Sequence, residues 1–207
     1  ALVEARVAES GDTLALREYD AASGGFANAL TWSAWHAVSL DVATALVAAG
    51  GDRGASLAIL ASNRLLWPVA ELGGALAGMV TVGIYPTSSS PQVRALLFDS
   101  EATILVVDSP EQLAKVREAT AGWERQLLVV ADVDEGQLVS CREGVREGVR
   151  EGVREGVREV GWAAFAAGGR AARVAHEPAA REVVARSASR TADDIAMLIY
   201  TSGSTGE

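Results

Sequence analysis

Short apolar segments alternate with stretches of helical pattern through the middle of this chain, and this alternation limits the fold more than any other feature. The apolar segments are residues 56–61, 80–85, 104–107 and 127–130. Between them the pattern predicts a helix that Ser62 or Asn63 caps and that runs through 72–77, then helices over 92–99 and 110–120. Strands that are apolar on both faces are typical of a parallel sheet between two helical layers. The sequence therefore predicts an α/β fold, with a mostly parallel sheet and helices on both faces.

The first fifty residues depart from this alternation and predict a helix, a hairpin and a second helix. The first helix covers residues 2–9, and the two strands of the hairpin, 14–19 and 26–30, flank a turn rich in glycine. Thr31 or Ser33 can cap the helix that follows, which ends at a pair of glycines, Gly50 and Gly51.

A four-residue unit, Arg-Glu-Gly-Val, interrupts the regular pattern and is repeated from residue 142 onward. A period of four fits neither a strand nor a helix, and a glycine inside a helix costs about 1 kcal/mol relative to alanine. We interpret residues 142–160 as a low-complexity insertion in a surface loop, with a functional charged arm as the less favoured alternative. Residues 163–172, rich in alanine, glycine and arginine, extend this loose connection. A helix over 177–185 and a turn at 191–194 then lead to a last strand.

The composition excludes several classes of protein. Apolar residues make up 49% of the 207 residues, enough for a full core, and the formal net charge is −9. Because nucleic-acid binding needs a basic face, this acidic balance argues against it. The single cysteine, Cys141, fits a reducing compartment, and no apolar run is long enough to cross a membrane. We expect a cytoplasmic protein with at most peripheral membrane contact.

Isolated polar residues give no catalytic or metal site. His36 and His176 stand apart from any partner in the sequence, so a structural or solvated role is favoured for each. The pair Asp193-Asp194 could bind a metal, but just before a strand it is better explained as part of a turn. We therefore assign no metal ligand.

The end of the chain has the character of an anion-binding loop. Residues 195–200 are apolar and predict a buried strand, which is followed by residues bearing hydroxyls or no side chain: Thr201, Ser202, Gly203, Ser204, Thr205 and Gly206. Glycine allows the backbone to approach a ligand closely, and successive N–H groups can form a concavity for a phosphate. The spacing fits neither the P-loop nor the dinucleotide fingerprint. By spacing alone a plain turn is equally consistent, but the preceding strand and the density of donors favour a phosphate.

Residues 200–206, Tyr-Thr-Ser-Gly-Ser-Thr-Gly, resemble the phosphate loop of the AMP-forming adenylating enzymes, which include acyl-CoA synthetases, luciferases and the adenylation domains of peptide synthetases. Residues 193–196 fit the same pattern. A second stretch, 82–93 followed by 99–102, is similar to the long-chain fatty acyl-CoA synthetase branch. The resemblance extends from Leu14 to the end of the chain, apart from residues 141–175.

The resemblance implies that residues 1–207 are part of the N-terminal AMP-binding domain of a fatty acid–CoA ligase, and that the fold is incomplete. Its substrates would be a fatty acid, ATP with Mg, and coenzyme A, joined through an acyl-adenylate. Residues 201–206 would bind the ATP phosphates. The family's lysine after this loop would follow Glu207, and its other catalytic groups lie still further on. We therefore assign no catalytic residue, and expect the 207 residues to need the remainder of the polypeptide for activity.

Two alternatives stay open. One is an acyl-AMP ligase, or another adenylation domain, that loads a carrier protein; the stretch at residues 85–89 disfavours it. The other is a non-catalytic α/β scaffold or a degenerate gene product, in which the repeat and the truncation after Glu207 are real features of the protein. The sequence that follows Glu207 would separate the enzyme from the scaffold.

Overall fold

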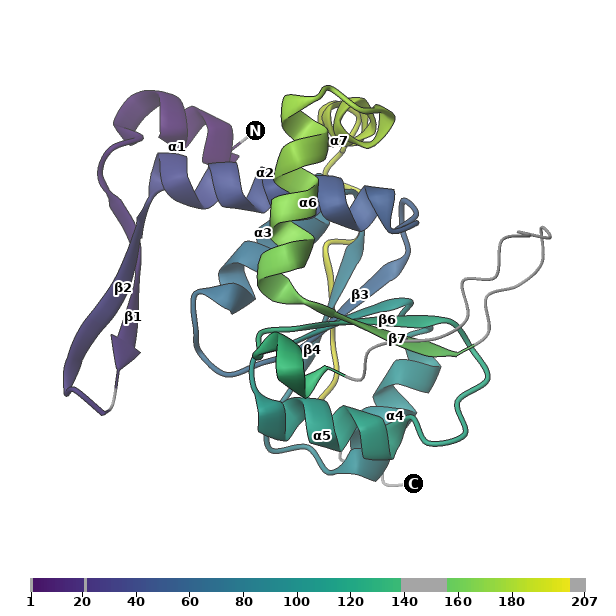
Figure 1. The fold of residues 1–207 in the computed structure, drawn as a ribbon. Helices are drawn as coiled ribbons and strands as arrows, with labels where there is room; N and C mark the ends of the chain where they lie inside the picture. Colours follow the sequence, from purple (N-terminus) through teal and green to yellow (C-terminus); the bar gives the residue numbers. More distant parts are fainter. Residues whose placement is uncertain (1, 21, 139–155, 202–207) are drawn as a thin grey trace.

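A six-stranded sheet forms the centre of the computed structural model, which describes residues 2–20, 22–138 and 156–201 (Figure 1). The strands lie in the order β7-β6-β5-β3-β4-β8, and each neighbouring pair is parallel. Their bounds are β3 Ser56–Leu60, β4 Val80–Ile84, β5 Ile104–Val107, β6 Leu127–Ala131, β7 Val157–Gly161 and β8 Met197–Ile199. The α/β fold predicted from the sequence is confirmed.

Helices cover both faces of this sheet, because successive side chains of a strand point to opposite sides. Leu57 and Ile59 of β3 pack in a cluster with α2 (Trp32–Ala48), α3 (Leu66–Leu76), α6 (Trp162–Val174) and α7 (Pro178–Ala188). Ala58 and Leu60, the alternate residues, pack in a second cluster with α4 (Ser90–Asp99) and α5 (Pro110–Ala119). The two clusters form the core on either side of the sheet.

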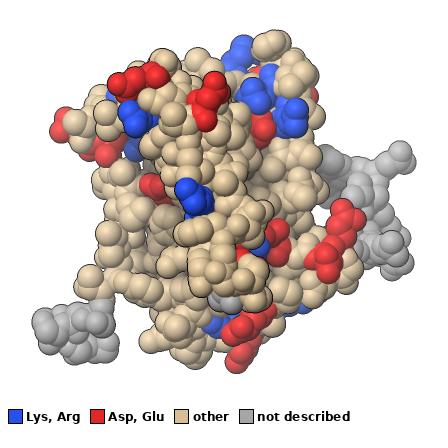
Figure 2. All heavy atoms as spheres, turned by 90° about the vertical axis from the view of Figure 1, so that its left-hand side faces the viewer, with Lys and Arg blue, Asp and Glu red and all other residues tan. Residues whose placement is uncertain are grey.

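The N-terminal segment lies to one side of the sheet. Helix α1 (Leu2–Ser10) is followed by an antiparallel hairpin of β1 (Leu14–Asp20) and β2 (Gly25–Thr31), which projects from the body in Figure 1. Thr31 caps α2, since its Oγ1 accepts a hydrogen bond of 3.2 Å from the backbone N–H of Ala34. On the side of the molecule shown in Figure 2, acidic and basic side chains of the described residues are interspersed rather than gathered by sign.

The predicted cap of α3 is wrong. The helix begins at Leu66, and neither Ser62 nor Asn63 is its N-cap residue. Instead the carboxylate of Glu18, from the hairpin, accepts a 3.1 Å hydrogen bond from the backbone N–H of Leu65. An anionic acceptor is favourable at a helix N-terminus, so a distant residue supplies what the local sequence was expected to supply.

The loose connection predicted at residues 163–172 is also wrong, because this segment lies within helix α6. Gly169 allows α6 to approach α2 closely: a Cβ at this position would lie 1.9 Å from the backbone oxygen of Asp41. Arg173 of α6 adds an ion pair of 2.6 Å with the Asp41 carboxylate. The helix predicted at 177–185 is confirmed as α7.

The repeat segment is described only in part. Residues 139–155 lie outside the described residues, so most of the predicted insertion at 142–160 stays a prediction. Its last residues are not a loop, however, because Val157–Gly161 forms β7, paired with β6. Arg117 of α5 donates two hydrogen bonds to Glu159, of 2.8 and 2.7 Å, and these fix the strand at the edge of the sheet. A short 3₁₀ helix, η1 (Glu135–Gln137), follows β6.

The last strand is exposed, in contrast to the buried strand predicted at 195–200. Ile195 and Ile199 are 62% and 73% exposed. The reason is that β8 is the outermost strand of the sheet and pairs on one side only, with β4. Across the described parts of the chain, no helix is long and apolar enough to cross a membrane.

Candidate functional site

A cleft of about 580 Å³ opens at the carboxyl ends of β3, β4 and β8. Each of these strands contributes to its wall through the residues that follow it. Ser62 and Asn63 come after β3, Tyr85 and Pro86 after β4, and Tyr200 after β8; Trp67 of α3 lies on the wall as well. In open α/β sheets, ligands bind in crevices at the carboxyl ends of strands, so this cleft is the candidate site.

The loop after β4 is held by two donors from α5. The backbone oxygen of Pro86 accepts hydrogen bonds from Gln112 Nε2, at 3.2 Å, and from the ammonium group of Lys115. Lys115 is the only lysine in the sequence. Since Gln112 is buried, the loop rests on the core rather than on solvent, and this wall of the cleft has a fixed position.

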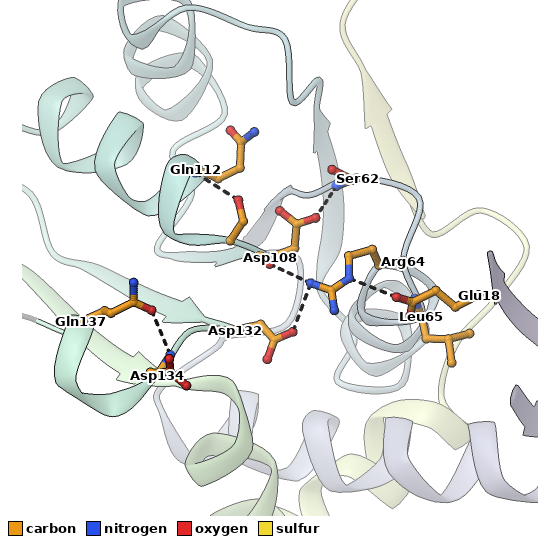
Figure 3. A network of polar contacts seen from close by, with 10 residues as sticks. Glu18, Ser62, Arg64, Leu65, Asp108, Gln112, Asp132, Asp134 and Gln137 are labelled. Atoms are coloured by element: carbon orange, nitrogen blue, oxygen red, sulfur yellow. Dashed lines mark hydrogen bonds and ion pairs between the residues drawn. The ribbon is translucent and has the colours of Figure 1, made fainter. Parts of the chain in front are cut away.

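The loop after β3 is held by a network of Glu18, Arg64, Asp108 and Asp132 (Figure 3). Arg64 Nε lies 3.2 Å from Glu18 Oε1, and its Nη1 donates a 3.0 Å hydrogen bond to the backbone oxygen of Asp108. The same Nη1 lies 3.6 Å from Asp132 Oδ2. Asp108 Oδ2 in turn accepts a 2.8 Å hydrogen bond from the backbone N–H of Ser62. We call these four residues the Arg64 network.

The Arg64 network places three carboxylates around one guanidinium group. Burial raises the pKa of Asp132, the Arg64 charge opposes this rise, and the neighbouring Asp108 charge adds to it. Asp108 is only 2% exposed, and its Oδ1 has no hydrogen-bond partner among the described residues. The close approach of these three acidic residues therefore depends on Arg64, whose positive charge lies between them.

The cleft lies beside β4 and β8 rather than at the reversal of strand order. The chain passes from β3 to β4 on one side, and then crosses β3 to place β5 on its other side. Such a reversal of strand order between β3 and β5 normally creates the ligand crevice. Here the residues that follow these two strands, Arg64 and Asp108, are bonded to each other, and the cleft lies on the other side of β3.

The end of β8 carries the first residues of the predicted phosphate loop. The hydroxyl of Tyr200 donates a 2.6 Å hydrogen bond to Asp99 Oδ2, at the C-terminus of α4. Burial, followed by the hydrogen bond and charge of Asp99, raises the pKa of Tyr200 to about 12. Thr201 is exposed beyond the strand, and Ser202 to Gly206 lie outside the described residues. The phosphate loop therefore stays a prediction, although its starting point is known.

The other polar residues considered in the sequence do not join this site. His36 lies in α2, where burial lowers its pKa, and His176 is exposed after α6. Asp194 accepts a hydrogen bond from the backbone N–H of Thr191 and pairs with Arg53 at 3.2 Å, as expected for a turn. Cys141 is outside the described residues. Within the described part of the chain, no group of three or more His, Cys, Asp or Glu side chains has an arrangement that could hold a metal ion.

Two contacts at the site were not anticipated from the sequence, Arg64 with Asp108 and Asp99 with Tyr200. Arg64 and Asp108 each follow a predicted strand, but nothing in the spacing indicates that they meet across the sheet. Asp99 lies in the stretch 99–102 that carries part of the resemblance, yet its contact with Tyr200 joins residues 101 positions apart. The first pair joins the loops after two neighbouring strands, and the second joins the end of α4 to the end of β8, so only the folded structure reveals them.

The fold is that of a parallel α/β protein with a cleft, the candidate ligand site, at its strand ends. The chain belongs to the family of AMP-binding enzymes, whose family model matches residues 3–207. The expected family is thus confirmed.

Curated relatives refine the comparison. Residues of this chain are 38% identical over 77 positions to the long-chain-fatty-acid–CoA ligase heimdall of Drosophila melanogaster, covering 37% of this chain and 11% of that protein. They are 30% identical over 166 positions to the long-chain-fatty-acid–CoA ligase FadD15 of Mycobacterium bovis, covering 79% of this chain and 23% of that one. The chain thus spans less than a quarter of the length of either relative.

Solved structures support the same fold. The complex of VinN with 3-methylaspartate matches 99% of this chain and 44% of its own, with a TM-score of 0.61 and 15% identity. The anthranilate CoA ligase AuaEII with anthranoyl-AMP matches 63% of this chain and 24% of its own, with a TM-score of 0.56 and 19% identity. At these identities the likeness concerns the fold alone.

Proposed function

We propose that these residues are the N-terminal part of a long-chain fatty acid–CoA ligase, and that residues 201–206 bind the phosphates of ATP. The position of Tyr200 is the observation that most supports this. Tyr200 follows β8 and lines a cleft at the carboxyl edge of a parallel sheet, where ligands of such folds bind, and residues 201–206 come next in the sequence. The long-chain fatty acid–CoA ligases among the curated relatives support the choice of acyl substrate.

The proposed reaction has two steps. The fatty carboxylate attacks the α-phosphorus of ATP, so that an acyl–phosphate bond forms, the α–β phosphoanhydride bond breaks and pyrophosphate leaves. The thiol of coenzyme A then attacks the acyl carbon, losing its proton, and AMP leaves. Backbone N–H groups and hydroxyls of residues 201–206 would stabilise negative charge as it shifts to pyrophosphate, because preorganised donors favour the developing charge.

Magnesium and coenzyme A have no assigned residues in this chain. The described residues contain no cluster of three side chains that could hold a metal ion. The magnesium that accompanies ATP in the proposed reaction would then be bound by the nucleotide and by groups outside the described residues. The residues described here would position the loop and the cleft walls.

The first experiment is ATP–pyrophosphate exchange by the full-length protein, with fatty acids of different lengths. Exchange that depends on a long-chain fatty acid supports the proposal, and its absence with every acid contradicts it. Adding coenzyme A or an acyl carrier protein then identifies the acceptor. Acyl-CoA formation is the expected result, and transfer only to the carrier would favour the adenylation domain that loads a carrier. The 207 residues alone should give no acyl-CoA from ATP, palmitate and coenzyme A.

The loop itself is tested with a matched pair of serine variants. Ser204→Ala removes a hydroxyl from the predicted phosphate loop, whereas Ser23→Ala removes one from the turn of the hairpin. A hydrogen bond to a charged group contributes about 1.5 to 3 kcal/mol, so Ser204→Ala should slow exchange by about 10-fold to 100-fold. Ser23→Ala should leave the rate unchanged. Equal rates for the two variants would show that the loop is a plain turn.

A further inference from the structure

The contact between Tyr200 and Asp99 joins the two stretches that carry the family resemblance. Tyr200 is the first residue after β8, and Asp99 is the last residue of α4. Their side chains meet through a 2.6 Å hydrogen bond from the phenol oxygen to Asp99 Oδ2. The bond therefore lies one residue before the predicted phosphate loop.

Little else holds the chain at this point. Strand β8 is three residues long and pairs with β4 only, and Ile199 and Thr201 are exposed. Within residues 195–201, all of which the structure describes, the Tyr200 hydroxyl makes the only side-chain hydrogen bond. The ring of Tyr200 also packs against the core cluster on the α4 side of the sheet. Tyr200 is thus the anchor where strand becomes loop.

The acceptor of this bond belongs to a well-fixed helix. At the start of α4, Ser89 and Gln92 form a capping box. Val93 and Leu97 are fully buried in the core. Arg94 donates hydrogen bonds to the backbone oxygen of Ala119, at 2.7 Å, and to that of Ala121. Asp99 therefore gives Tyr200 a partner whose position is set by the core.

We infer that Asp99 is a positioning residue for adenylation, which acts through the Tyr200 hydroxyl to hold the start of the loop 201–206. The inference rests on the proposed function of that loop. Donors stabilise a transition state only when they are already in place, and a misplacement of about 1 Å can lower a rate by about 100-fold. Removing the bond should therefore lower the rate of adenylation and weaken ATP binding, without changing the affinity for the fatty acid.

The experiment uses the full-length protein and four variants: Tyr200→Phe, Asp99→Ala, Asp99→Asn and the double variant Tyr200→Phe/Asp99→Ala. Tyr19→Phe, in the hairpin, is the matched control because it removes the hydroxyl of an exposed tyrosine that has no part in the bond to Asp99. For each protein, kcat and the KM values for ATP and for fatty acid are measured by pyrophosphate exchange, together with Tm.

Tyr200→Phe and Asp99→Ala should each lower kcat/KM for ATP by up to about 100-fold, the loss expected when a group is misplaced by about 1 Å. The KM for fatty acid should not change. Asp99→Asn keeps an acceptor oxygen and should recover most of the rate. The double variant should be no slower than the slower single variant, since both changes remove the same bond. Tyr19→Phe should behave like the unchanged protein.

Three results would overturn the inference. The first is that Tyr200→Phe and Asp99→Ala catalyse pyrophosphate exchange at the same rate as Tyr19→Phe. The second is a double variant whose loss is the product of the two single losses, which would mean that the residues act independently. The third is a fall in Tm with the KM for ATP unchanged, which would show a role in stability alone. If the unchanged protein catalyses no exchange, the proposed function itself fails, so the two failures are distinguishable.

Discussion

Arg64 and Glu18 form an ion pair, with 3.2 Å between Nε and Oε1, that joins the N-terminal hairpin to the wall of the cleft. The same carboxylate accepts the backbone N–H of Leu65, just before α3. The hairpin, which projects from the body, is therefore tied to the loop after β3 by one side chain (Figures 1 and 3). A change at either residue should affect both the hairpin and the cleft.

Arg64→Met should destabilise the protein by about 1 to 2 kcal/mol. The variant loses the hydrogen bonds and ion pairs of the Arg64 charge. Their contribution to stability is reduced by solvent, because the Arg64 side chain is 43% exposed. Arg170→Met, at an exposed position of α6, is the control and should have little effect. Urea denaturation of the two variants measures the difference, and equal free energies of unfolding would contradict the role given to the network.

The loss in free energy of unfolding caused by Arg64→Met, called here the deficit, should also depend on pH. Without the opposing charge of Arg64, the pKa of Asp132 rises further above its ordinary value of 3.8. When the pKa of a carboxyl is higher in the folded than in the unfolded state, ionisation of the carboxyl destabilises the folded state. The loss of folding stability therefore grows as pH rises above the ordinary pKa. We therefore expect the deficit to be small in acid and to grow towards neutral pH. A deficit that is constant over this range would exclude Asp132 as its source.

Gly169→Ala should be strongly destabilising, because its Cβ would lie 1.9 Å from the Asp41 backbone oxygen where α6 crosses α2. Overpacking of this kind costs about 1 to 3 kcal/mol, and backbone atoms cannot move aside as side chains can. The neighbouring Gly168 is an internal control, since a Cβ there has nothing within 4 Å. Gly168→Ala should stabilise the protein by up to about 1 kcal/mol through helix propensity. Opposite shifts of Tm for these adjacent positions are the expected result.

The same glycine shows why part of the fold escaped prediction. Strands β3 to β6 were found because each lies in a largely apolar segment, and β5 has the predicted bounds, Ile104–Val107. Helix α6 has no such run, and it is stabilised by its fit to α2, more than a hundred residues earlier in the chain. Its composition therefore resembled a loose connection. Strand β7 was missed for a related reason, because its place depends on the pairing of Glu159 with Arg117.

The candidate site could be predicted only in part. The run of hydroxyls and glycines predicts that residues 201–206 form a loop for an anion, and this stays a prediction because Ser202 to Gly206 lie outside the described residues. The residues that position its surroundings act through distant contacts: Arg64 with Asp108, and Asp99 with Tyr200. A single sequence gives no distance between such residues, so only the folded sheet brings them together.

Glu71, in α3, should make stability fall as pH rises through its pKa. Burial raises the pKa of this carboxyl above the ordinary value of 4.5. The folded state then holds the proton more tightly than the unfolded state does, so folding is favoured in acid and loses stability as the group ionises. Glu71→Gln removes the ionisation and should flatten this part of the pH profile, measured by urea denaturation between acid and neutral pH. An unchanged slope in the variant would contradict this origin.

Tyr200 should ionise at a pH well above an ordinary tyrosine. Its pKa is raised to about 12 from 10.0, first by burial and then by the hydrogen bond and charge of Asp99. The difference in ultraviolet absorbance between the unchanged protein and Tyr200→Phe isolates this one phenol during an alkaline titration. Because the unfolded chain loses the proton near its ordinary value, the contribution of Tyr200 to stability should fall as pH rises from 10 towards 12.

Asp99→Asn separates the causes of this shift. The variant keeps a hydrogen-bond acceptor but removes the negative charge that opposes the phenolate, so the pKa of Tyr200 should move down towards its ordinary value. It should stay above that value, because burial of the ring is unchanged. A transition of Tyr200 at the ordinary value of 10.0 in the unchanged protein would mean that the bond to Asp99 does not persist in solution.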